Sequence, residues 1–306
     1  MNEYAVEIGH LTYRVKKAFT LDDLSLRVPT GSIYGFLGPN GSGKTTTIRL
    51  ILGLLRPASG SITVLGNAVP ARAPAALART GYVPEAPHLD PTLTVAEAIW
   101  FHSQFYATWD AAWAARLLDD FELDRQRLFG RLSKGQKGKL MMLLALAQRP
   151  ELLVLDEPTD GLDPVVRRDM LSALLEYVSQ RRATVFISSH LIHELERICD
   201  WVGVMDNGRL VADVEMERFK TGMKRLKVSH GPTHTEGLPF RVLTRSPTNG
   251  NGTEMWLVRD WAPEMAAAVA AAGGELQQVI DLDLEEGFVE LLRSFRVPRT
   301  REAADV

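Results

Sequence analysis

The residues Gly38–Thr45 constrain the fold more than any other part of this chain, because they match the pattern G-x-x-x-x-G-K-[ST]. A short, mostly apolar run precedes the pattern at Ser32–Leu37, and apolar residues recur at helical spacing after it, over Thr46–Leu55. The pattern therefore lies between a predicted strand and a predicted helix, the context that a phosphate-binding loop requires. In such a loop, glycines let backbone N–H groups approach phosphate oxygens, and the helix N-terminus adds positive potential.

The loop predicts a nucleotide phosphate site. Lys44 is expected to reach the β- and γ-phosphates, and Thr45 to offer its hydroxyl to Mg²⁺. The alternative is a glycine-rich turn that contains a lysine by chance, and the flanking strand and helix disfavour it. The predicted nucleotide-binding residues of the loop and the first helical turn are Gly38, Pro39, Asn40, Gly41, Ser42, Gly43, Lys44, Thr45 and Thr46.

Two adjacent carboxylates follow a strongly apolar run at Leu152–Glu157. Near-continuous hydrophobicity indicates a strand buried on both faces, as in a parallel sheet, and ligands bind at the carboxyl edge of such sheets. Asp156 is expected to hold the Mg²⁺ that Thr45 also contacts. Glu157 points elsewhere by strand alternation and is expected to orient a water molecule. An acidic turn after a core strand is the alternative, which the upstream loop disfavours.

Two more residues are candidates for the same site. A second buried strand, over Ala183–Ser189, ends at His190 on the same sheet edge. A lone histidine there is more often a capping or core residue, but its position opposite the other two loops favours a functional role. Tyr13 lies in a region of short antiparallel strands. It either stacks on an adenine ring or is an ordinary half-buried strand aromatic.

Residues 93–130 have a helical composition, and Leu132–Gln136 then opens a strongly apolar helix that runs to about Gln148. Ser133 is the predicted N-cap of that helix. The preceding block is rich in aromatic side chains. Their helical spacing makes burial in the core the default expectation. One or two of them could instead lie at a surface that contacts a partner. These aromatics are Trp100, Phe101, Phe105, Tyr106, Trp109 and Trp113.

Charge and composition exclude several classes of function. The formal net charge of −3 gives no reason to expect a nucleic-acid partner. The single cysteine, Cys199, excludes an intramolecular disulfide and is expected to be buried filler in a reducing compartment. The N-terminus lacks the blocks of a signal peptide, and the longest apolar run, Leu140–Ala147, is too short to cross a bilayer. Any membrane role is therefore expected to come through a partner.

A separate unit is predicted from about residue 218. Alternating strands and two helices indicate a small α+β domain over residues 218–297, followed by a disordered tail over residues 298–306. No chemistry is evident in this domain, and a structural or dimerisation module is the preferred interpretation. The first domain is expected to span residues 1–217, with a helical subdomain at about residues 93–130.

Taken in order, the phosphate loop, Leu132–Gln136, Leu152–Glu157 and His190 resemble the motifs of ABC transporter ATP-binding subunits over about residues 3–217. The Leu-Ser-x-Gly-Gln element distinguishes this family from other phosphate-loop NTPases, which lack it. The resemblance implies an α/β fold: a P-loop NTPase (ABC ATPase) core with an antiparallel β subdomain and a helical subdomain, followed here by the small α+β domain.

The resemblance also implies a mechanism. Two copies pair head to tail and bury two ATP molecules, each with Mg²⁺, between them. Asp156 would hold Mg²⁺ through water, Glu157 would be the general base, and His190 would contact the γ-phosphate. Asp163 matches the acidic residue of the family that links the two ATP sites across the dimer. The helical block would dock on an integral membrane permease subunit. The segment expected to contact the ATP bound to the partner copy comprises Ser133, Gly135 and Gln136.

Three positions depart from the family pattern. Glu85 stands where a glutamine usually senses Mg²⁺, and it is expected to join the metal-binding set as a carboxylate. The adenine-stacking aromatic would fall at Val15, so either Tyr13 substitutes for it or stacking on the adenine is weak. Lys134 replaces a common glycine.

The function expected from the resemblance is ATP hydrolysis that drives export through the permease, at the cytoplasmic face of the cell membrane, in the manner of bacterial ABC-2 exporters. The alternatives are a non-transport ABC ATPase acting on ribosomes or DNA, and a regulatory module that binds ATP without hydrolysing it.

Overall fold

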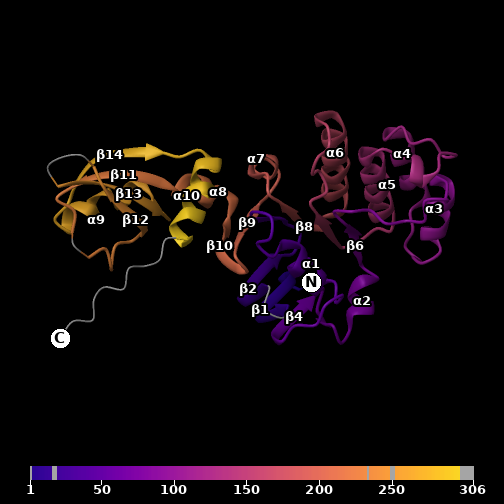
Figure 1. The fold of residues 1–306 in the computed structure, drawn as a ribbon, viewed down its shortest axis with the longest axis horizontal. Helices are drawn as coiled ribbons and strands as arrows, with labels where there is room; N and C mark the ends of the chain where they lie inside the picture. The colour runs from indigo at the N-terminus through magenta and orange to yellow at the C-terminus, as the bar shows by residue number, and fades with distance from the viewer. Residues whose placement is uncertain (1, 16–18, 233, 249–251, 297–306) are drawn as a thin grey trace. The chain divides into compact units, whose positions relative to one another are not determined.

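A computed structural model of the chain describes residues 2–15, 19–232, 234–248 and 252–296 (Figure 1). The chain divides into two compact units. One comprises Met1–Leu191 and Ile198–Leu210, and the other comprises Ile192–Arg197 and Val211–Val306. The division falls inside strand β10 (Arg209–Glu215), whereas the sequence placed a domain boundary after residue 217. The predicted tail at residues 298–306 lies outside the described residues.

The first unit is built around a six-stranded sheet in the order β10-β9-β3-β8-β7-β6. The pairs β3/β8, β3/β9, β7/β8 and β6/β7 are parallel, and every residue of β3, β7 and β8 is buried, as the continuous apolar runs predict. Its strands are β3 (Ile33–Leu37), β6 (Thr80–Val83), β7 (Leu152–Asp156), β8 (Thr184–Ser189), β9 (Trp201–Asp206) and β10.

Helices flank this sheet and complete the α/β core. Helix α1 (Lys44–Ile51) packs against β7, and α5 (Lys134–Ala147) packs against β6 and against α6 (Pro164–Arg181). The P-loop NTPase fold expected from the motifs is confirmed.

An antiparallel sheet, in the order β2-β1-β4-β5, forms the predicted β subdomain of the first unit. Its core joins leucine, valine and isoleucine side chains of these strands to residues of α1, such as Ile48 and Leu50. The strands are β1 (Tyr4–Val15), β2 (Phe19–Pro29), β4 (Ser59–Val64) and β5 (Asn67–Val69). The sequence analysis missed β5 and the short helix α2 (Ala73–Leu77) that follows it.

The helical block comprises α3 (Val95–Ser103), α4 (Ala111–Asp120) and the 3₁₀ turn η1 (Phe129–Arg131), which gather with α5 at one end of the first unit (Figure 1). The expectation of a mostly buried set, with one or two aromatics at a partner surface, underestimates their exposure. Trp100, Phe101 and Phe105 are 65%, 52% and 66% exposed. Helix α3 buries only its Val95 and Ala98 face, which leaves Trp100 and Phe101 on the surface, and Phe105 lies beyond the end of this helix.

The second unit contains a four-stranded antiparallel sheet in the order β12-β13-β11-β14. Apolar side chains around the fully buried Trp256 form its core. Among the described residues, no helix combines the length and the hydropathy needed to cross a bilayer. The elements are α7 (Ile192–Leu195), α8 (Met216–Gly222), β11 (Lys224–Ser229), β12 (Arg241–Pro247), β13 (Thr253–Arg259), η2 (Pro263–Met265), α9 (Ala266–Ala271), β14 (Glu275–Asp281) and α10 (Leu284–Arg296).

Candidate nucleotide site

The phosphate loop leaves the buried strand β3 and enters α1 through two glycines in the left-handed region, Gly41 (φ 80°) and Gly43 (φ 116°). L-residues rarely adopt these angles, so the backbone requires glycine at both of these positions. Lys44 turns back over the loop and donates from Nζ to the carbonyl oxygen of Gly38 at 2.7 Å. Its side chain is only 5% exposed, so its charge lies in a poorly solvated position.

A distant hairpin turn supports the loop from outside. Residues Asn207 and Gly208, between β9 and β10, have φ values of 46° and 77°, the pattern of a type I′ turn. The Gly208 N–H donates to the carbonyl oxygen of Ser42 at 2.9 Å. A Cβ atom at Gly208 would overlap the carbonyl oxygen of Thr20. No local sequence pattern encodes this contact between the hairpin and the phosphate loop.

Glu157 lies between the loop lysine and the histidine predicted for the site. Its Oε1 is 3.1 Å from Lys44 Nζ, and its Oε2 is 2.9 Å from His190 Nδ1. The Glu157 side chain is 8% exposed, and its backbone adopts a φ of 47°, which is unusual for a residue other than glycine. Such conformations cluster at functional sites, because the surrounding structure must hold them in place.

Asp156 accepts hydrogen bonds at the end of β7. Thr45 Oγ1 donates to its Oδ1 at 3.2 Å, and Ser188 Oγ donates to the same oxygen at 2.8 Å. Burial raises the pKa of Asp156, the two hydroxyl donors oppose that rise, and the nearby charges of Glu85 and Glu157 add to it. Ser188 also accepts from the Glu157 N–H at 3.0 Å, so one hydroxyl fixes both carboxylate residues. Sequence analysis did not identify Ser188.

The Leu-Ser-x-Gly-Gln segment forms its own local structure. Ser133 caps α5 in a capping box with Gln136, in which each side chain accepts from the other residue's backbone N–H. A Cβ atom at Gly135 would lie 3.2 Å from the methyl groups of Val166 on α6. In the part of the chain that the structure describes, these contacts do not join the segment to the phosphate loop.

Asp160 connects this segment to the site through ion pairs. Lys134 Nζ is 3.3 Å from Asp160 Oδ2, and His190 Nε2 is 3.8 Å from Asp160 Oδ1. Three residues later, Asp163 caps α6 by accepting from the backbone N–H groups of Val165 and Val166, each at 3.1 Å. The sequence analysis predicted no role for Asp160.

The two adenine candidates occupy different environments at the end of β1. Tyr13 is partly buried and packs against the core of the antiparallel sheet, whereas Val15 is 42% exposed. The assignment of adenine stacking to either residue stays a prediction. Glu85 is exposed in the segment after β6.

These groups fit a nucleoside triphosphate with a divalent cation. The Ser42 hydroxyl is buried and, among the described residues, lacks a hydrogen-bond partner, so it is available to a phosphate oxygen. The buried Lys44 supplies a positive charge for the same group. The oxygens of Thr45 and Asp156, 3.2 Å apart, are the hard ligands that Mg²⁺ prefers. The fold and site therefore define a phosphate-loop nucleotide hydrolase.

Comparison with known proteins gives the family. The family model described as "ABC transporter" matches residues 21–160. The Nod factor export ATP-binding protein I of Burkholderia orbicola (strain AU 1054) is 38% identical over 220 residues, which cover 70% of this chain and 71% of that protein. The bacitracin transport ATP-binding protein BcrA of Bacillus licheniformis is 36% identical over 203 residues, covering 66% of each chain.

A solved structure described as the ATP-binding subunit of an ABC transporter agrees in fold. It superposes with a TM-score of 0.64 at 29% identity and covers 71% of this chain and 92% of that one. The chain belongs to the ABC transporter family, as an ATP-binding protein with ATPase activity. The resemblance drawn from the sequence motifs is confirmed.

Proposed function

We propose that two copies of this chain hydrolyse Mg-ATP between them and drive export through a separate membrane subunit. The observation that carries the proposal is the buried group formed by Lys44, Glu157 and His190 beside the Thr45–Asp156 pair. This arrangement supports a role for Glu157 as a carboxylate base, with Lys44 and His190 as cationic or hydrogen-bonding groups for a terminal phosphate.

Lys44 has two competing partners in the proposed reaction. In the structure its ammonium faces Glu157 and the Gly38 carbonyl oxygen. A bound triphosphate carries more negative charge than one carboxylate, so Lys44 turns to the phosphates and leaves Glu157 to act as a base. Water then attacks the γ-phosphorus, the bond to the β–γ bridging oxygen breaks, and Glu157 takes the proton from the water. His190 holds Glu157 through its Nδ1 contact.

Magnesium would be held by Thr45 and Asp156, with Glu85 nearby, and when bound it supplies charge stabilisation to the phosphate oxygens. Ser188 keeps the Asp156 carboxylate in position through its 2.8 Å hydrogen bond.

The second copy supplies Ser133, Gly135 and Gln136. These residues lie at an exposed or half-exposed helix start, capped by its own side chains, and helix N-termini bind phosphate groups. Asp163 lies at another exposed helix start and is the proposed link between the two sites.

The pairing of copies is tested with Glu157→Gln, which removes the base and keeps the shape of the side chain. With Mg-ATP, the purified variant should double in mass by light scattering, and with Mg-ADP it should not. A variant that stays monomeric with Mg-ATP, even with its membrane partner present, excludes the proposed dimer.

An aromatic surface on the helical block supports a membrane partner. Exposed Trp100 lines a cavity of about 210 Å³ together with Ile99 and Leu118. The exposed rings of Phe101 and Phe105 contact each other, with centroids 5.1 Å apart. Exposed aromatic clusters mark protein interfaces. We assign this surface to a short amphipathic helix of the membrane subunit. The names of the two relatives, which specify Nod factor export and bacitracin transport, support the export of a cell product.

Co-purification tests this surface. Trp100→Ala combined with Phe105→Ala should abolish capture of the co-expressed membrane subunit, while ATP binding by the isolated variant is retained. Leu54→Ala changes another exposed apolar residue, 62% accessible, and should leave capture unchanged. Full capture by the double variant refutes the assignment.

A further inference from the structure

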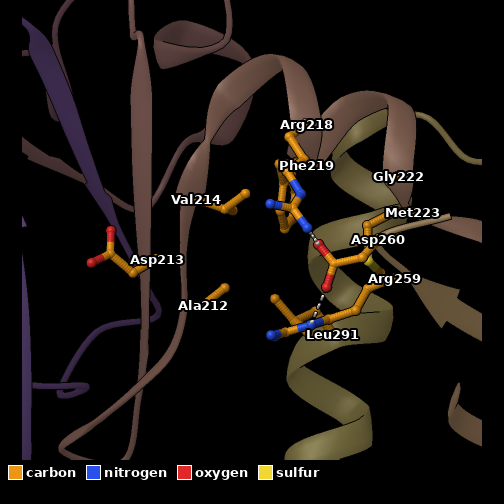
Figure 2. Close-up of a pocket in the computed structure, with 10 residues that line it drawn as sticks. All are labelled: Ala212, Asp213, Val214, Arg218, Phe219, Gly222, Met223, Arg259, Asp260 and Leu291. Atoms are coloured by element: carbon orange, nitrogen blue, oxygen red, sulfur yellow. Dashed lines mark ion pairs between the residues drawn. The ribbon is translucent and has the colours of Figure 1, made fainter. Parts of the chain in front are cut away.

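The second unit contains a cavity unrelated to the phosphate loop. Its volume is about 170 Å³, more than ten times the roughly 10–15 Å³ that one water molecule needs. Residues from β10, α8, β13 and α10 line it (Figure 2). Part of the wall is apolar, formed by Val214, Phe219, Met223 and Leu291, of which the last three are buried. The cavity therefore has room and apolar contact area for a small molecule.

One side of the cavity is charged. Figure 2 shows Arg218 and Arg259 converging on the carboxylate of Asp260. Arg218 Nη2 is 3.0 Å from Asp260 Oδ1, and Arg259 Nε is 3.3 Å from Asp260 Oδ2. Asp213, the other lining carboxylate, points away from this group (Figure 2). Two guanidinium groups thus share one carboxylate.

A third arginine adds to this positive charge. Arg241 on β12 is the direct cross-strand partner of Arg259 on β13. Side chains that are paired in this way share a face of the sheet, and like charges at such positions repel each other. An additional anion near Arg259 would relieve this repulsion.

The Asp260 carboxylate is held in place by an unusual backbone. Asp260 has a φ of 61°, and a Cβ atom at Gly222 would lie 3.2 Å from its backbone nitrogen. The next residue, Trp261, donates its N–H to the Gly222 carbonyl oxygen at 3.1 Å. Uncommon backbone conformations of this kind persist where the surrounding structure over-determines them, often at ligand-binding positions.

We propose that this cavity binds a small amphiphilic anion, a carboxylate or phosphate headgroup joined to a short apolar chain. The headgroup takes hydrogen bonds from Arg218 and Arg259, and Asp260 is the internal carboxylate that it displaces. Guanidinium groups suit this role because their planar N–H pairs match the geometry of carboxylates and phosphates. The apolar chain lies against Val214, Phe219 and Leu291. This inference does not depend on the proposed export function.

Calorimetric titration of the full-length, nucleotide-free protein tests the proposal with butanoate, hexanoate, hexyl phosphate, inorganic phosphate and hexylammonium. Hexanoate should bind with one site per chain, and hexyl phosphate should compete with it for that site. Affinity should rise about fourfold for each methylene from butanoate to hexanoate, as expected for burial of apolar area. Inorganic phosphate should bind more weakly than hexyl phosphate. The absence of saturable binding by both hexyl anions, or equal binding by hexylammonium, overturns the proposal.

Variants locate the site. Arg218→Gln and Arg259→Gln should each weaken hexanoate binding by roughly tenfold to a hundredfold, as expected for the loss of a hydrogen bond to a charged group. Asp260→Asn should tighten binding, because it removes the competing carboxylate and keeps the side-chain shape. Asp213→Asn is the matched control and should leave affinity unchanged. Unaltered hexanoate affinity in both arginine variants places the ligand elsewhere. Weaker hexanoate binding by Asp260→Asn, in a protein of normal thermal stability, also contradicts the proposal.

Discussion

The two halves of the proposed nucleotide site, the phosphate loop with its neighbours and the segment that begins α5, are built in different ways. Around the phosphate loop, the functional groups are buried and linked to one another: Lys44 to Glu157, Glu157 to His190, and Thr45 to Asp156. The segment that begins α5 is exposed at Ser133 and Lys134 and satisfies its hydrogen bonds locally. The first half is assembled within one chain. The second is a prepared surface, which suits action on a ligand held by another copy.

The electrostatic environments of the two halves also differ. The Lys44 and Glu157 side chains are 5% and 8% exposed, so removing one partner leaves the other charge poorly solvated. The Lys134 and Asp160 side chains are 58% and 39% exposed, and ion pairs of this kind contribute within about 1 kcal/mol. Substitutions in the two halves should therefore differ in both kind and size.

The largest expected effect is on turnover in Glu157→Gln. Loss of a general base lowers the rate by about 10²- to 10⁴-fold. Phosphate release at saturating Mg-ATP measures the rate, and equilibrium titration with labelled ATP checks that binding persists. Turnover at the wild-type rate would mean that a group other than Glu157 accepts the proton from water, and that the buried half does not supply the base.

A mixing experiment tests the division of labour between copies. Lys44→Ala disables the buried half, and Ser133→Asp places a negative charge at the exposed half while keeping an N-cap residue. Each variant alone should be inactive. An equal mixture should recover about a quarter of the wild-type rate, because half of random dimers are mixed and each mixed dimer has one intact site. No recovery from two well-folded variants would indicate that the two halves of a single chain act on the same ATP molecule.

Asp156→Asn should separate stability from activity. Burial raises the pKa of Asp156, so the folded protein holds this proton more tightly than the unfolded chain does, and the ionised carboxylate lowers stability at neutral pH. The variant should have a higher melting temperature at pH 7, and the gain should shrink as the pH falls through the folded-state pKa. Mg-dependent hydrolysis should be lost. Thermal melts across pH, without nucleotide, measure the first effect. A lower melting temperature at pH 7 would contradict it.

The smallest effect is expected from Lys134→Ala. The exposed pair with Asp160 contributes within about 1 kcal/mol, so denaturant unfolding should change little and ATP hydrolysis should stay within a few-fold of wild type. Raising the salt concentration should further reduce the difference in stability between Lys134→Ala and the wild type. A loss of ATP hydrolysis as large as that expected for Glu157→Gln would indicate that Lys134 takes part in the reaction, which the geometry of the exposed half does not suggest.

Local sequence patterns predicted much of this architecture. The glycines at 41 and 43, the capping serine at 133 and the apolar run at Leu152–Leu155 each determine their own conformation, and the structure agrees. Contacts between distant segments escaped prediction because no local pattern encodes them. Ser188 reaches Asp156 only because β7 and β8 are neighbours in the sheet.

Exposure was equally difficult to predict. Helical spacing placed most aromatics of the helical block in the core by default, but which faces are covered depends on how neighbouring helices pack. Trp100 and Phe105 are consequently on the surface. In the second unit, Arg218, Arg259 and Asp260 come together only when α8 lies beside β13, so no local sequence pattern indicated a cavity there.

The type I′ turn at Gly208 has a consequence for local opening fluctuations of the protein. Its N–H is committed to the Ser42 carbonyl oxygen, and its own carbonyl oxygen accepts from the N–H of Asp22 at 3.1 Å. Local opening of this hairpin tip removes the outer support of the phosphate loop. The hydrogen-exchange rate of the Gly208 amide should therefore serve as a gauge of how often the empty loop loses its shape, and ATP should slow that exchange.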